Sequence, residues 1–113
     1  SKVSWVNYPA LSDNPYKSLI ERDYNNLGSG VLSFGIKGGR EAGANFIDAL
    51  KLFYRLVNIG DSKSLATHPA STTHRQLNSA QLQTAGVSED MIRLSVGIEH
   101  IDDLIEDLTQ ALD

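Results

Sequence analysis

The sequence contains no cysteine among its 113 residues. A disulfide framework, a zinc site built on thiolates and a cysteine nucleophile are therefore excluded. A domain of this size that is built without disulfides suits a reducing compartment, so we expect a cytoplasmic location.

Long apolar runs and basic stripes are also missing. No run approaches the roughly 20 residues that a membrane-spanning helix needs, so we expect no membrane contact. The net charge of -4 and the scattered lysines and arginines argue against nucleic acid as a partner. With 41% hydrophobic residues, the chain is long enough for one modest core, which predicts a single domain over residues 1–113.

Familiar catalytic and metal motifs are absent as well. His68 and His74 are six residues apart, which is not the spacing of a helical metal pair, so no metal site is expected. The glycines in 28–30 and 35–39 match no phosphate-binding loop, and a tight turn explains them better. Serines and threonines crowd residues 62–73 without a G-x-S-x-G elbow, which leaves only a weak signal for a nucleophile.

Strands are indicated by alternation of apolar and polar residues. Residues 31–37 and 91–98 alternate clearly, and each has one apolar and one more polar face. Shorter strands are predicted at 3–6 and 56–59. The polar faces must contact something, which could be solvent, a ligand or another domain.

Helices are indicated by apolar residues at three- and four-residue spacing. This spacing predicts helices over 16–22, 40–54 and 101–112, and a short one from Asn78 or Ser79 to Thr84 that Gly86 stops. Residues 61–76 are expected to be irregular. The whole pattern predicts an α+β fold, a two-layer sandwich in which helices cover one face of a small, mostly antiparallel sheet.

Arg93 is the most unusual residue of the second clear strand. It lies between Ile92 and Leu94, on the face that also carries Ser95. An arginine in such a strand needs a partner, because its charge does not titrate away. Periodicity alone slightly favours an internal carboxylate, and a ligand carboxylate gripped by the guanidinium fork is the alternative.

Several blocks resemble the Cys/Met-metabolism family of pyridoxal-phosphate enzymes, in the family's own order. They are Trp5 to Pro9, Val31 to Phe34, Gly38-Gly39, Ser64 to His74, and Met91 to Glu99 followed by Asp102 to Leu108. The segment Asn58 to Leu65 is most similar to the family's O-acetylhomoserine sulfhydrylase branch. The resemblance implies the small C-terminal domain of a fold-type I enzyme. The start at Ser1 rather than Met is expected of a tag scar, of processing or of the tail of a longer chain.

The resemblance also implies roles for three residues. Arg93 matches the arginine that binds the substrate's α-carboxylate, and Thr73 matches a threonine near the active site. Asn58 stands where many relatives carry a substrate-contacting serine, and its amide can still donate to a carboxylate. The family's Schiff-base lysine belongs to an earlier, larger domain, and no lysine here stands in its Ser-x-Thr-Lys motif.

The expected function follows from the family. The complete enzyme is expected to use pyridoxal 5'-phosphate, to form a homotetramer, and to make L-homocysteine and acetate from O-acetyl-L-homoserine and sulfide. By itself, this chain is expected to bind no cofactor and to be inactive, needing the N-terminal cofactor domain as its partner. Cystathionine γ-synthase, cystathionine γ-lyase and methionine γ-lyase are alternatives, and so is a free-standing module that binds an amino acid through Arg93.

Overall fold

Five strands form one mixed sheet in the computed structural model, which describes all residues from Ser1 to Asp113. The strands are ordered β1-β2-β5-β4-β3 across the sheet. Only the β3–β4 pair is parallel, and the other three pairs are antiparallel. The predicted α+β class is therefore confirmed. The strand bounds are β1 Val3–Asn7, β2 Val31–Ile36, β3 Tyr54–Arg55, β4 Leu65–Thr67 and β5 Met91–Ser95.

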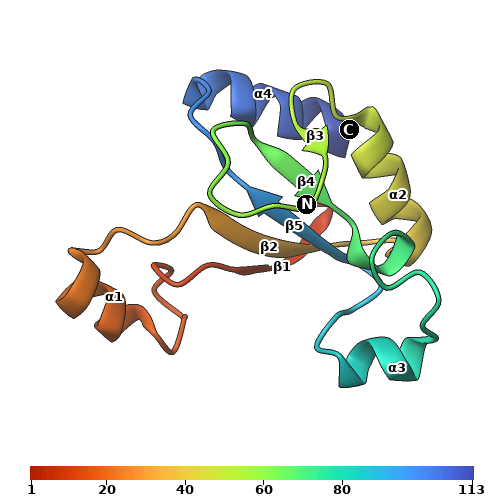
Figure 1. Ribbon diagram of the computed structural model, residues 1–113, viewed down its shortest axis with the longest axis horizontal. Coiled ribbons are helices and arrows are strands. Elements are labelled where there is room, and N and C mark those ends of the chain that lie inside the picture. Colours follow the sequence, from red (N-terminus) through yellow and green to blue (C-terminus); the bar gives the residue numbers. More distant parts are fainter.

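Two of the four α-helices cover one face of the sheet. Figure 1 shows α2 (Gly39–Ala49) and α4 (Ile101–Leu112) side by side on that face. In the same view α1 (Lys17–Tyr24) and α3 (Ser79–Thr84) lie at opposite ends, apart from that layer. A short 3-10 helix, η1 (Pro69–Ser71), follows β4. No helix is long and apolar enough to cross a membrane.

The main core lies between the sheet and the α2–α4 layer. Phe34 and Ile92 lie opposite each other in β2 and β5, and both are buried. Phe46 of α2 packs edge-on against Phe34, with ring centroids 5.6 Å apart, and Leu104 of α4 completes the contact. Since neighbouring residues in a strand face opposite sides, the alternation seen in the sequence assigns the buried face correctly.

A smaller apolar cluster packs α3 against η1. Ala70, Leu82 and Val87 are its buried members. Asn78 caps the helix: its side chain accepts from the Gln81 N–H, and the Gln81 side chain accepts from the Asn78 N–H in return. This capping box confirms the predicted start of the helix.

Two predicted elements are wrong around residue 50. The helix predicted over 40–54 ends at Ala49, because the carboxylate of Asp107 accepts hydrogen bonds from the N–H groups of the next turn. The strand predicted at 56–59 does not form. The chain instead pairs at Tyr54–Arg55 and at Leu65–Thr67, within a stretch expected to be irregular.

Candidate functional site

A row of polar side chains crosses the face of the sheet that α2 and α4 leave uncovered. Asn7 of β1 lies opposite Ser33 of β2, Ser33 lies opposite Arg93 of β5, and Arg93 lies opposite Thr67 of β4. Directly opposed residues in a sheet point to the same side. The row therefore brings four strands' polar groups to one surface, with the guanidinium near its middle.

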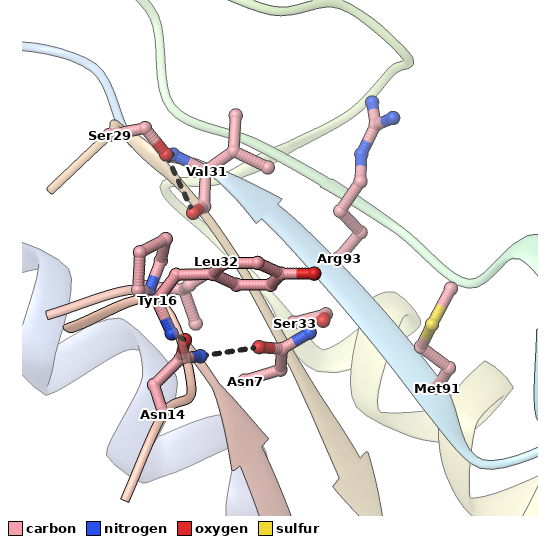
Figure 2. A pocket seen from close by; sticks show the side chains of 10 residues that line it. Asn7, Asn14, Tyr16, Ser29, Val31, Leu32, Ser33, Met91 and Arg93 are labelled. Carbon is pink, nitrogen blue, oxygen red and sulfur yellow. Dashed lines mark hydrogen bonds between the residues drawn. The ribbon is translucent and has the colours of Figure 1, made fainter. Parts of the chain in front are cut away.

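An open pocket of about 360 Å³ lies over this row. Figure 2 shows Asn7, Asn14 and Tyr16 across the pocket from Arg93. The Asn14 amide donates to Asn7 Oδ1 at 3.2 Å, and Asn14 Oδ1 accepts from the Tyr16 N–H at 2.9 Å. These bonds fix the segment after β1 as one wall. The remaining lining residues are Pro9, Ser29, Val31, Leu32, Ser33 and Met91.

Arg93 has no carboxylate partner in this chain. Its Nη2 donates to the main-chain oxygen of Asn58 at 3.3 Å, and none of the ion pairs involves it. Its Nε is buried and has no hydrogen-bond partner. The internal salt bridge that periodicity slightly favoured is therefore not formed.

The geometry of Arg93 suits a carboxylate ligand. A buried N–H without a partner is uncommon and costs roughly 1–3 kcal/mol. The Nε–H and a terminal N–H of a guanidinium point in parallel, which matches the two oxygens of one carboxylate. A carboxylate ligand that reached the guanidinium would accept from the orphaned Nε–H and neutralise the unpaired charge.

The other two predicted site residues are placed differently. Asn58 meets Arg93 through its main-chain oxygen, while its side-chain amide donates to Asp61 at 3.2 Å. Thr73 lies outside the pocket of Arg93, and its hydroxyl pairs with His74 at 2.8 Å. Its neighbour Thr72 instead bonds the hydroxyl of Thr67, which is the cross-strand neighbour of Arg93.

A second polar network joins the residue before β4 to the segment after β5, and the sequence did not reveal it. Glu99 accepts from the Ser64 N–H at 2.8 Å and from the Ser64 hydroxyl at 2.7 Å. The Ser64 oxygen accepts in turn from the Gly97 N–H at 2.8 Å. Burial opposes ionisation of Glu99, but these hydrogen bonds hold its pKa below the ordinary value. No local spacing relates residues 35 positions apart, so the tertiary fold was needed to find this pair.

Comparison with known proteins identifies the family of this chain. A family model described as Cys/Met metabolism PLP-dependent enzyme matches residues 1–113. The chain belongs to this family. It is 49% identical over 98% of its length to O-acetyl-L-homoserine sulfhydrylase 1 of Thermus thermophilus, of which it covers 26%. It thus spans about a quarter of the length of such curated relatives.

Two solved structures of family members share the fold. A candidate O-acetylhomoserine (thiol)-lyase from Campylobacter jejuni, which carries a pyridoxyl-lysine, matches 98% of this chain with 48% identity and a TM-score of 0.85, over 26% of its own length. Cystathionine γ-lyase from yeast matches 99% with 40% identity and a TM-score of 0.90, over 29% of its own length. The relatives therefore include both a sulfhydrylase and a lyase.

The residues of this chain do not fit the family's cofactor. A pyridoxal-phosphate enzyme needs a lysine that reaches the cofactor's aldehyde. None of the five lysines is buried, and none lines the pocket of Arg93. The donors present fit a substrate carboxylate, and the expectation that this chain alone binds no cofactor stays a prediction.

Proposed function

We propose that this chain is the small C-terminal domain of a longer pyridoxal-phosphate enzyme and that Arg93 binds the α-carboxylate of its amino-acid substrate. The observation that carries the proposal is the buried Nε of Arg93, which has no partner in a chain that offers its guanidinium no carboxylate. The family match supports an amino-acid substrate for the complete enzyme.

The role of Arg93 is to position the substrate. Two parallel hydrogen bonds to the carboxylate fix the rotation of the substrate about its Cα, so the Cα–H bond is held in a reactive direction. The electron sink for the chemistry would be supplied by pyridoxal phosphate, held by residues of a larger N-terminal domain. Tyr16 and Asn14 form the wall of the pocket opposite Arg93.

Asn58 and Thr73 have supporting parts in this proposal. Asn58 holds the guanidinium through its main-chain oxygen, and its side-chain amide, which gives one N–H to Asp61, keeps a second N–H for a carboxylate. Thr73 is exposed and does not line the Arg93 pocket, so we assign it to the boundary with the larger domain.

The reaction we favour is transfer of sulfide to O-acetyl-L-homoserine, which gives L-homocysteine and acetate in the cytoplasm. Relatives named O-acetyl-L-homoserine sulfhydrylase and homocysteine synthase support it, at 47–51% identity. The second candidate is the elimination chemistry of cystathionine γ-lyase or methionine γ-lyase, which the 44% identity to L-methionine γ-lyase of Pseudomonas putida favours. We expect the complete enzyme to be a homotetramer.

The test of the carboxylate site is Arg93→Ala in the complete enzyme. We expect kcat/KM to fall by roughly 30-fold to over a thousand-fold, because losing one partner of a desolvated charge pair costs about 2–5 kcal/mol. Arg93→Lys should also lose activity, since the fork is lost. Arg22→Ala is the matched control, because Arg22 pairs only with its exposed neighbour Asp23.

Two further readouts make the test specific. The wild type should prefer O-acetyl-L-homoserine over its methyl ester strongly, and Arg93→Ala should lose that preference. Sulfide transfer releases acetate without ammonia, whereas elimination releases ammonia and a 2-oxo acid, so ammonia release separates the two reactions. Near-normal kcat/KM in Arg93→Ala would refute the assignment.

A further inference from the structure

We infer that Glu99 and Ser64 form a clamp that positions the loop carrying Asn58, and through it the guanidinium of Arg93. Glu99 is thus a positioning residue for carboxylate binding. The inference rests on the proposed function of Arg93 and goes beyond it, because it assigns a role to two residues that lie outside the Arg93 pocket.

The loop of residues 56–64 joins β3 to β4. We call it the Arg93 loop because its residue Asn58 contacts Arg93. Residues 56–60 are all exposed, so this part of the loop has no anchor in the core. Asp61 braces it from within by accepting from the Asn58 amide at 3.2 Å and from the Lys63 N–H at 2.9 Å. A loop with few buried contacts is held by its polar bonds, and it opens easily when they are removed.

The clamp supplies these bonds at the end of the loop. The carboxylate of Glu99 takes both the N–H and the hydroxyl of Ser64, while Gly97 donates to the Ser64 oxygen. Beside it, the Ile98 N–H donates to the Ser62 main-chain oxygen at 3.0 Å. Bonds to an ionised acceptor are about twice as strong as neutral ones. The clamp therefore ties the loop to the segment that continues from β5, the strand of Arg93.

The approach of the two segments is too close for a larger residue. A Cβ added at Gly97 would collide with the Ser62 main-chain oxygen and lie 2.7 Å from the Lys63 main-chain carbon. Both contacts are to backbone, which cannot rotate away. The close contact between the Arg93 loop and residues 97–99 therefore requires glycine at position 97 as well as the hydrogen bonds of the clamp.

The functional consequence follows from populations. If the clamp is broken, the Arg93 loop is ordered for only a fraction of the time, and the Asn58 oxygen that holds Arg93 Nη2 moves with it. The apparent affinity for the substrate is then the intrinsic affinity multiplied by the fraction of time that the loop is ordered. The bound complex, once formed, reacts as before. Loss of the clamp should therefore raise KM and leave kcat nearly unchanged.

The test compares Glu99→Gln, Ser64→Ala and their double variant in the complete enzyme. Glutamine keeps the size of Glu99 but replaces one of its two acceptor oxygens by an NH2 donor, so one of the two bonds from Ser64 loses its acceptor in the present geometry. We expect KM for the amino-acid substrate to rise roughly 5- to 50-fold with kcat within about threefold. The two single effects should combine to less than their product, because they break one network. Glu106→Gln, at an exposed position on α4 with no side-chain partner, is the matched control and should leave KM unchanged.

An independent readout is hydrogen–deuterium exchange. Peptides covering residues 56–64 should lose protection in Glu99→Gln, while those covering α2 keep it, which also reports that the protein stays folded. Glu99→Asp provides a milder variant should Glu99→Gln fold poorly, and it should show the same direction. An unchanged KM, or a kcat that falls as much as kcat/KM, would overturn the clamp. If Arg93→Ala is damaging while Glu99→Gln is neutral, only the clamp fails; if Arg93→Ala is neutral, the carboxylate site itself fails.

Discussion

Asp107 offers the sharpest stability prediction in this chain. Its buried carboxylate accepts from the N–H groups of Lys51 at 2.8 Å, Leu52 at 2.8 Å and Phe53 at 3.0 Å, and from the Gln110 amide at 3.0 Å. These bonds stop α2 and tie its end to α4. Asp107→Ala leaves three main-chain donors without their acceptor.

The magnitude follows from these contacts. A hydrogen bond to a charged group contributes roughly 1.5–3 kcal/mol, and the effects of three on one acceptor are not additive. Water can reach Lys51 and Leu52, which lie nearer the surface than buried Phe53. We therefore expect Asp107→Ala to lower the free energy of unfolding by about 3–5 kcal/mol. Asp107→Asn should lower it by about 2–3 kcal/mol, because the NH2 of the new amide would face main-chain N–H donors. Total stability of such a domain is about 5–15 kcal/mol, so the loss is large.

The assay is urea unfolding of the 113-residue chain, followed by far-ultraviolet circular dichroism and by fluorescence of Trp5, the single tryptophan. Asp107→Ala should lower the midpoint by roughly 2 M. Asp13→Asn, at an exposed position without a side-chain hydrogen bond, is the matched control and should stay within about 0.5 kcal/mol of the wild type.

The same variants carry a pH signature. Burial opposes ionisation of Asp107, yet the hydrogen bonds from Lys51, Phe53, Leu52 and Gln110 hold its pKa below the ordinary 3.8. Its contribution is therefore complete above that value and is lost as pH falls through the lower pKa of the folded state. The gap between wild type and Asp107→Asn should be constant from pH 7 to about pH 5 and narrow only below about pH 4. A loss under 1 kcal/mol for Asp107→Ala at pH 7 would refute the reasoning.

Two other substitutions test separate parts of the fold. Asn78→Ala removes the capping box of α3 and should cost about 1 kcal/mol, whereas Asn78→Asp keeps the acceptor and should be nearly neutral; equal melting temperatures for both would contradict the cap. Gly97→Ala forces a Cβ against the main chain of Ser62 and should cost about 1–3 kcal/mol in urea unfolding, with loss of exchange protection at residues 56–64. A variant as stable as the wild type would show that the two segments can separate freely.

The predictions from sequence succeeded where the signal is local. Alternation in 31–37 and 91–98 identified the buried face that holds Phe34, Ile92 and Leu94, because side chains along a strand alternate between its two sides. Asn78 and Gly86 marked the ends of α3 through the preferences of single positions. The blocks around residues 64–74 and 91–99 indicated the family, and the comparisons confirm it.

The tertiary structure decided what depends on distant residues. Helical spacing continues past Ala49 as far as Tyr54, and only the carboxylate of Asp107, more than 50 positions away, ends the helix. The strand at 65–67 was missed because its antiparallel partner, β5, begins more than 20 residues later, and its parallel partner, β3, has only two residues.

Arg93 shows the division most clearly. The sequence alone indicates that Arg93, in an apolar strand, requires a partner, because a guanidinium stays charged. Whether that partner is internal cannot be read from the strand, because the fold decides which acidic residues of the chain come near it. The fold brings Asn58 and a polar row to Arg93 but no carboxylate, which leaves its charge and its Nε–H for a ligand.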